Sequence, residues 1–342
     1  MTGRAADLTS MDTTWLTARL PRSQLIPRRT EADYYGASDL IAAALRYPAA
    51  PRSIASWMHA VSYEQHLDYP ELLFPEGNRV TRHLVATTAQ VKLLKARGYL
   101  RAYAVGVPYL YVEPANAVRM PGSLLVMPAH TVAKALLSFE EEAYGEQLDQ
   151  IRGRFDRVVA CISAPCARSG IWTKTLERRG IPWILGADSS DRNALRRMAR
   201  LFASFEYMTT NTLGSHIAYA AFSGCKVSIC GPYPRYRLED FKELAWYKKN
   251  WGKAQQVIDA MSEPNVRARH PMLFKEPWDA QPLEDWAAQV LGLDNKRSHV
   301  ELARLLGWTV TGQTEVVIHR AARRTADLAQ AVVRRIRRVA PI

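Results

Sequence analysis

The sequence predicts an α/β protein with two Rossmann-like domains followed by a basic C-terminal helix. Its 342 residues exceed the size of one ordinary domain, which is about 100–200 residues. A hydrophobic content of 48% is enough to fill packed cores. From residue 124 to residue 229, short apolar segments alternate with helical segments. This alternation is typical of a parallel sheet with helices on both faces.

The first domain is expected over residues 1–120. Residues 32–47 have a helical composition that ends at Pro48. The apolar segment from Arg79 to Ala86 predicts a strand, and Thr87 with Thr88 would cap a helix that reaches Lys95. The elements of this half are less regular than those that follow.

The second domain is expected over residues 121–310, after a hinge at Arg119–Ser123. A long helix should begin at Thr131 and reach about residue 155, and Asp191 should cap a helix that ends near Phe202. The short apolar segments predict five buried strands: Leu124–Met127, Arg157–Ile162, Trp183–Leu185, Phe205–Met208 and Lys226–Ile229.

The third segment, residues 311–342, is expected to be a basic amphipathic helix. Its arginines include Arg320 and Arg338, and an apolar stripe runs among them. Such a helix suits an anionic membrane surface. It suits equally a helix that packs its stripe on the protein and leaves its charges in water. The net charge of +13 favours an anionic partner.

The lack of export signals and the spacing of the cysteines indicate where in the cell the protein is expected. No apolar run approaches the roughly 20 residues of a membrane span, and no signal-peptide core follows Met1. We therefore expect a cytoplasmic protein, with peripheral attachment to the inner face of the cell membrane as an option. The four cysteines lack the spacing of a zinc site and should be reduced thiols.

The most informative stretch is the eight residues that follow the strand at 205–208. Six of the eight carry a hydrogen-bonding side chain, namely Thr209, Thr210, Asn211, Thr212, Ser215 and His216, and Gly214 lies among them. A helix should begin here, and its first turn offers unpaired N–H groups and a partial positive charge. Hydroxyl groups around such a terminus suit a phosphate. One capping residue would be ordinary, but this density favours a ligand site at the carboxyl end of a strand.

A second segment repeats this arrangement. The strand that ends near Met127 is followed by His130 and Thr131, which should open a helix. A protonated histidine at a helix N-terminus is unfavourable unless an anion is also bound there. Gly186 and Asp188 follow a third strand and should lie at the same edge of the sheet.

Several motifs are absent. The sequence contains no Gly-x-Gly-x-x-Gly, no P-loop and no His-Glu-x-x-His. A dinucleotide-dependent oxidoreductase, a P-loop NTPase and a zinc protease are therefore poorly supported. We expect neither a metal nor a cofactor.

The segments around His130, around Gly186 with Asp188, and from Thr209 to His216 resemble motifs of bacterial GT-B glycosyltransferases. The most similar patterns belong to enzymes that use CMP-activated acidic sugars such as sialic acid or Kdo, and to related capsule and lipopolysaccharide enzymes. The resemblance implies that residues 121–310 bind a nucleotide-sugar and that residues 1–120 bind a glycan or glycolipid acceptor. It implies that His130, Thr131 and the 209–216 segment hold the phosphate. Thr131 stands where the sialyltransferase pattern has proline, and the helix after Gly214 lacks a ribose-binding glutamate.

Sugar transfer to an acceptor requires a group that takes the hydroxyl proton. The resemblance implies that this group comes from the first domain. His59, Glu64 and Glu76 are the candidates.

Two other classes stay open. One is a sugar-nucleotide epimerase or hydrolase on the same fold. The other is a basic nucleic-acid-binding or scaffold protein, which is less expected because the arginines concentrate in the terminal segment and do not alternate with aromatic residues.

Overall fold

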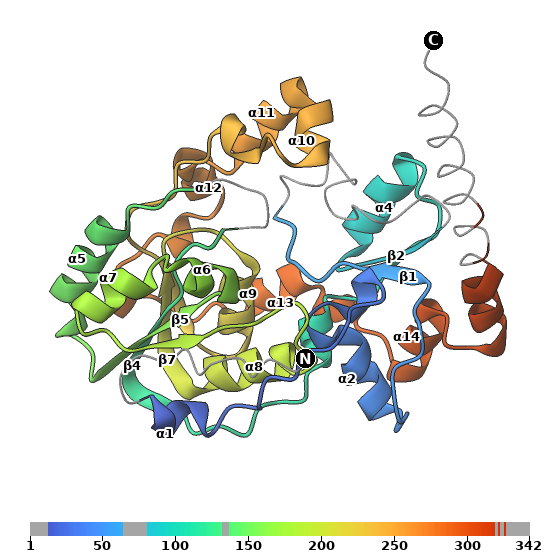
Figure 1. Cartoon of the computed structure of the whole chain (residues 1–342), viewed down its shortest axis with the longest axis horizontal. Coiled ribbons are helices and arrows are strands. Elements are labelled where there is room, and N and C mark those ends of the chain that lie inside the picture. Colours follow the sequence, from blue (N-terminus) through green and yellow to red (C-terminus); the bar gives the residue numbers. More distant parts are fainter. Residues whose placement is uncertain (1–12, 64–80, 132–136, 319–320, 322–324, 326–342) are drawn as a thin grey trace, which may run out of the picture.

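The computed structural model describes residues 13–63, 81–131, 137–318, 321 and 325. It contains two parallel sheets with helices around them, one built from residues 55–104 and one from residues 120–229 (Figure 1). The predicted α/β class is confirmed. Most of the predicted basic helix, residues 311–342, lies outside the described residues; those that are described, 311–318, 321 and 325, are helical.

The larger sheet has five parallel strands in the order β6-β5-β4-β7-β8. Their bounds are β4 Met120–Val126, β5 Arg157–Ile162, β6 Trp183–Leu185, β7 Phe205–Thr210 and β8 Lys226–Ile229. The chain runs outward from β4 to one side, then returns to β7 and continues to the other side. The direction of winding therefore changes between β4 and β7, which is where open α/β sheets leave a crevice for ligands.

Alternating side chains of β4 pack against helices on opposite faces of this sheet. Leu124 and Val126 contact the core under α5 and α7, whereas Leu125 belongs to the core under α8 and α9. This follows from the two-residue period of a strand. The covering helices are α5 Glu141–Arg152, α6 Ala164–Ser169, α7 Thr173–Arg178, α8 Ala194–Ser204 and α9 Ser215–Phe222.

The smaller sheet has three parallel strands, β1 Ala55–Trp57, β2 Arg82–Val85 and β3 Ala102–Ala104. The predicted capping of α4 (Thr88–Ala96) is confirmed, because Thr87 Oγ1 accepts the Gln90 N–H at 3.3 Å and Gln90 closes a capping box. Helix α2 (Ala37–Ala44) precedes this sheet.

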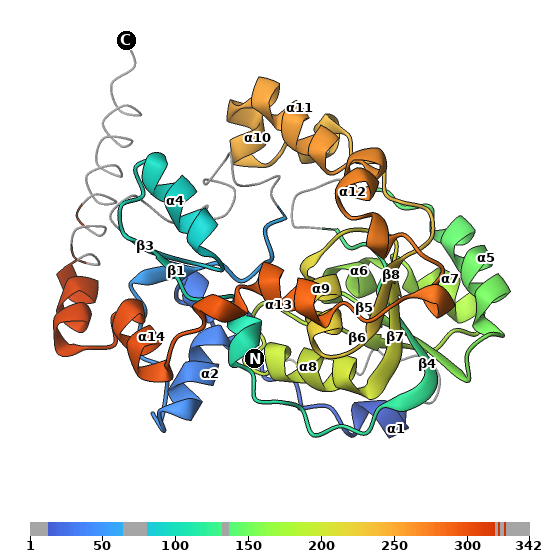
Figure 2. The ribbon, with the colours of Figure 1, turned by 180° about the vertical axis from the view of Figure 1, so that it is seen from behind.

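The end of the described chain returns to the smaller sheet. Helix α14 (His299–Leu306) lies beside α2 and β2, and Leu306 O accepts the Ile54 N–H at 2.9 Å. The Trp308 indole N–H donates to Ser53 Oγ at 3.1 Å. Both views show this C-terminal part next to the β1–β3 sheet (Figures 1 and 2).

The remaining helices surround these two bodies. The α-helices are α1 Thr14–Thr17, α10 Ala245–Lys249, α11 Trp251–Ala260, α12 Glu263–Arg269 and α13 Glu284–Leu291. The 3-10 helices are η1 Glu31–Gly36, η2 Pro108–Tyr111, η3 Leu238–Phe241, η4 Pro271–Leu273, η5 Pro277–Asp279 and η6 Leu293–Asn295.

Three predictions about elements are wrong. The expected hinge at Arg119–Ser123 is mostly strand, because β4 already begins at Met120. Thr131 does not open the long helix, since residues 137–140 are not helical and α5 begins only at Glu141. Asp191 does not cap α8 directly: its Oδ1 accepts the N–H groups of Asn193 at 2.9 Å and of Gln24 at 2.8 Å. It ties the N-terminal segment to the start of that helix.

Candidate functional site

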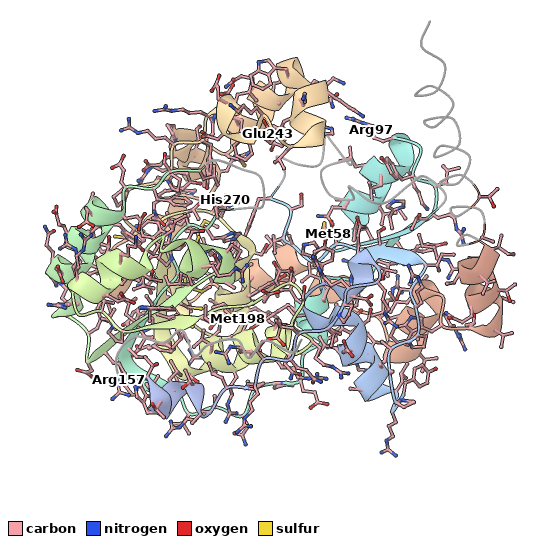
Figure 3. All side chains as sticks on the ribbon, viewed as in Figure 1. Met58, Arg97, Arg157, Met198, Glu243 and His270 are labelled. Atoms are coloured by element: carbon pink, nitrogen blue, oxygen red, sulfur yellow. The ribbon has the colours of Figure 1, made fainter. Side chains whose placement is uncertain are left out.

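A cavity of about 510 Å³ lies at the carboxyl ends of the strands, between the two sheets. This volume falls within the range of small-molecule sites, which is about 300–1,000 Å³. The larger sheet contributes the segments after β4, β5 and β6 and the first turn of α9. The smaller sheet contributes His59, and the N-terminal segment contributes Arg28 and Tyr35. Met198 of α8, labelled in Figure 3, forms part of the apolar wall with Leu195 and Phe202.

The two segments that the sequence singled out do converge, as the strand order requires. His130, Ser215 and His216 all line the cavity. Asn211 holds the two loops together, because its Oδ1 accepts the Ala129 N–H at 2.8 Å and its Nδ2 donates to Pro232 O at 2.8 Å. The side chain of a buried asparagine therefore fixes the position of the residue before His130.

The predicted binding role of Thr209, Thr210, Asn211 and Thr212 receives no support, because these side chains are buried and do not line the cavity. Thr209 Oγ1 bonds Ser228 Oγ at 3.0 Å, Thr210 Oγ1 accepts the Thr212 N–H at 3.3 Å, and Thr212 Oγ1 bonds the Tyr236 hydroxyl at 2.9 Å. The hydroxyl groups satisfy one another inside the fold. They shape the loop, whereas Ser215 and His216, which follow it, line the cavity.

The first turn of α9 forms one wall of the cavity. Ser215 Oγ accepts the Val61 N–H at 2.9 Å, so its own proton stays available for a ligand. The Nε2 atom of His216 is buried and has no hydrogen-bond partner among the described residues. Burial, and secondarily the nearby His130, lower the pKa of His216 to about 3, so its ring is neutral at pH 7.

Gly214 makes room for that ring. A Cβ atom at this position would lie 2.7 Å from Cε1 and 2.8 Å from Nδ1 of His216. The Gly214 backbone is extended, with φ −155°, so the requirement for glycine comes from the imidazole and not from backbone strain. Its carbonyl oxygen accepts the Tyr63 hydroxyl at 3.2 Å.

The segment after β5 adds two residues that sequence reasoning missed, Ser163 and Arg168. Ser163 Oγ is a second buried cavity-wall atom without a partner among the described residues. Arg168 is exposed, and none of the described ion pairs includes it. The signal available in the sequence was a serine directly after a buried strand and before Pro165.

Gly186 and Asp188 lie on the cavity wall after β6, as predicted. Asp188 Oδ1 accepts the Ser190 N–H at 2.8 Å, which forms a tight turn. This turn holds the N-terminal segment, since Ser189 O accepts the Tyr35 N–H and Ser190 O accepts the Ile26 N–H, both at 2.9 Å. A Cβ atom at Gly186 would lie 3.0 Å from Cys161 Sγ.

His59 faces these residues from the smaller sheet. Its ring stacks on Tyr34 with a centroid distance of 4.5 Å, and Arg28 lies 4.3 Å from the Tyr34 centroid. The carbonyl oxygen of His59 accepts the Tyr219 hydroxyl at 2.7 Å. Burial, and secondarily the Arg28 charge, lower the pKa of His59 to about 4. The imidazole is therefore neutral near pH 7 and has a free lone pair.

Tyr35 lies next to this group in a conformation that is rare for a residue with a side chain, with φ 58°. Such strain persists only where the surroundings enforce it, and it is concentrated at binding and catalytic sites. Here the following Gly36 approaches the turn before α8 so closely that a Cβ atom would lie 2.0 Å from Arg192 O.

The remaining predicted site residues either lie away from the cavity or fall outside the described residues. Thr131 does not line the cavity, and its N–H donates to Cys166 Sγ at 3.4 Å. Glu64 and Glu76 lie outside the described residues, so both stay predictions. Within the described ranges, no three His, Cys, Asp or Glu side chains are grouped to hold a metal ion. The four cysteines are free thiols.

None of the helices in the described part of the chain is long and apolar enough to cross a bilayer. Whether the protein attaches to a membrane surface stays a prediction.

Comparison with known proteins gives distant matches only. The sequence matches no protein-family model, and no curated protein matches it. The pneumococcal O-GlcNAc transferase GtfA, solved with UDP and GlcNAc, aligns with a TM-score of 0.31 and 10% identity over 74% of this chain and 47% of its own. A mutant of S. aureus TarM, solved with Fondaparinux, alpha-GlcNAc-glycerol and UDP, aligns with a TM-score of 0.30 and 13% identity over 69% of this chain and 45% of its own. This chain thus spans less than half of either protein. At these values the similarity assigns neither a fold nor an activity to it.

Proposed function

We propose that this protein is a glycosyltransferase of the GT-B type. It would move a sugar from a nucleotide-activated donor to a glycan or lipid-linked acceptor in cell-surface polysaccharide synthesis. One observation carries the proposal: two buried polar atoms, Ser163 Oγ and His216 Nε2, have no partner in the described part of the chain, and both lie on the wall of one cavity that two arginines also line. Buried polar atoms are nearly always hydrogen-bonded, so such a pair points to a ligand that completes them.

The donor phosphate fits the side of the cavity formed by the larger sheet. Arg168 supplies a forked cation, His130 and the Ser215 hydroxyl supply further donors, and the first turn of α9 adds unpaired N–H groups. Together these groups would stabilise the negative charge that develops on the leaving phosphate. They do so without a metal ion, and a CMP-linked sugar is one donor that they would accept.

The acceptor would enter from the side of His59. In a direct displacement, the acceptor oxygen forms a bond to the anomeric carbon while the bond from that carbon to the phosphate oxygen breaks. The phosphate leaves with the electron pair, and the acceptor proton passes to the neutral imidazole of His59. A histidine whose pKa is about 4 is a weak base, but the acceptor hydroxyl becomes acidic as its new bond forms.

A thermal-shift screen tests the proposal. A ligand that binds only the folded state raises the melting temperature. CMP, UDP, GDP and their sugar conjugates are added in turn, and we expect one nucleotide series to stabilise the protein. Turnover of the same sugar conjugate only when a glycan or glycolipid is added would separate a transferase from an epimerase or hydrolase.

A matched pair of glycine variants locates the bound nucleotide. Gly214→Ala would push the His216 ring from its position and should weaken the response about tenfold or more, as the loss of a charge-assisted contact does. Gly153→Ala is the control, because nothing lies within 4 Å of the added methyl group. A response that is flat for every nucleotide, or equal in both variants, would rule out this site.

A further inference from the structure

A second groove lies on the other side of α8, away from the cavity described above. Its volume is about 450 Å³. The N-terminal segment contributes Arg19, Leu20 and Pro21, the connection to β4 contributes residues 112–116, and α8 contributes Arg196 and Arg200. Both views show the connection between η2 and β4 passing along α8 toward α1 (Figures 1 and 2).

The groove is strongly and unevenly charged. Of the described residues that line it, three are arginines, Arg19, Arg196 and Arg200, and one is a carboxylate, Glu113. None of the ion pairs or side-chain hydrogen bonds found in residues 13–63, 81–131 and 137–318 includes these three guanidinium groups. By contrast, Arg197 on the same helix donates to Pro21 O, and Arg192, two residues before the helix, donates to Asp39 Oδ1.

Two of these arginines are partly withdrawn from water, which makes the arrangement costly without a counter-ion, whereas Arg19 is exposed. Arg196 and Arg200 are half-buried, and they lie one turn apart on the same face of α8. Like charges at that spacing repel each other, and an arginine withdrawn from water is normally paired. Arg19 approaches from a different segment, so the three cations surround one space and do not form a stripe along a helix.

We propose that this groove binds a small molecule that carries two or more phosphate groups. The guanidinium fork matches phosphate oxygens in pairs, and three cations around one space favour more than one anionic group. The bound molecule would join the N-terminal segment, the connection to β4 and α8. This site does not depend on the proposed transferase activity.

Calorimetric titration of the full chain with inorganic tripolyphosphate tests the site, at about 150 mM salt so that weak surface attraction is screened. The double variant Arg196→Gln with Arg200→Gln should lose about tenfold or more in affinity, as the loss of charge-assisted hydrogen bonds predicts. Its melting temperature without ligand should be unchanged or higher, since a repulsion is removed. The variant Arg168→Gln, altered in the other cavity, should keep this binding.

A control variant removes two positive charges at a site distant from the groove. Lys249→Gln with Lys253→Gln changes two exposed lysines of α10 and α11 and should leave the affinity within about twofold. An equal loss in both double variants would show a general charge effect and overturn the proposal. Binding to phosphatidylglycerol vesicles that requires Arg196 and Arg200, with no binding of tripolyphosphate, would overturn it in favour of a lipid surface.

Discussion

At the scale of one residue, the burial of His216 in the cavity wall costs stability, because its ring is held neutral and one ring nitrogen lacks a described partner. Its Nε2 atom is buried without a partner among the described residues, and its pKa is lowered to about 3. In the unfolded chain the same ring has an ordinary pKa near 6.5. Folding therefore stabilises a neutral ring in a place that would suit a proton donor to an anion.

The lowered pKa makes stability depend on pH. Between about pH 6.5 and pH 3 the unfolded state holds a proton on His216 that the folded state lacks, so stability is complete above pH 6.5 and is lost as the pH falls. We expect His216→Gln to reduce the slope of the free energy of unfolding by up to about 1.4 kcal/mol per pH unit in this range. Urea unfolding at pH 7 and pH 5 measures it.

His59 also makes the folded state less stable as the pH falls, since its pKa is lowered to about 4. The double variant His59→Gln with His216→Gln should therefore flatten the acid side of the stability curve further. A slope that is the same in the wild type and in both variants would mean that neither ring is neutralised by burial.

Asn211 acts at the level of elements, because it joins the end of β7 to the loop after β4. Asn211→Ala would leave the Ala129 N–H and the Pro232 carbonyl without their partner inside the protein. We expect a loss of about 2–4 kcal/mol in the free energy of unfolding, the cost of two unmatched buried groups. Asn116→Ala, at an exposed position with no side-chain bond, is the control and should change the stability little.

The elements that could be predicted are those with strong local patterns. All five strands of the larger sheet lie where short apolar runs predicted them, and Thr87 caps α4 as expected. The convergence of His130 with Ser215 followed from the parallel topology alone. The helix expected at Thr131 shows the limit, because helix propensity did not reveal that residues 137–140 are not helical and that α5 begins only at Glu141.

The orientation of the side chains at residues 209–212 could not be predicted from the sequence. The sequence shows how many hydroxyl groups a turn contains but not which way each one points. Here the buried ones bond to Ser228 and Tyr236, which come from later segments. Ser163 and Arg168 were missed because single polar residues after a strand are common in any sequence. Only their position on the cavity wall distinguishes them from other such residues.

At the scale of the molecule, each end of the described chain packs on the sheet that is farther from it in sequence. The start of the chain lies against the five-stranded sheet, and its end lies against the three-stranded sheet. Residues near the start lie against the larger sheet, as the bridge between Leu25 and Asp191 shows. Residues 299–318 lie against the smaller sheet, where Arg82 and Arg101 both pair with Glu315. The predicted division at residues 120 and 310 stays a prediction, but these contacts cross it in both directions.

This packing of the chain ends predicts the effect of truncation. A chain that stops at residue 297 would expose the surface of the smaller sheet that α14 and Trp308 cover, and should lose its cooperative thermal transition. A chain that stops at residue 325 keeps every described residue and should melt within a few degrees of the full chain, about 2–4 °C. Circular dichroism during heating distinguishes the two. Equal melting curves would show that the returning segment adds nothing to stability.

The returning C-terminal segment also bears on how the protein is made. The three-stranded sheet emerges from the ribosome early, yet Ser53 and Ile54 find their partners at Trp308 and Leu306 only after some 250 further residues have been synthesised. The five-stranded body, whose strands all lie between residues 120 and 229, can close sooner. The five-stranded sheet is therefore expected to fold first, although it is translated second, because the three-stranded sheet needs residues 306–308 to complete its contacts.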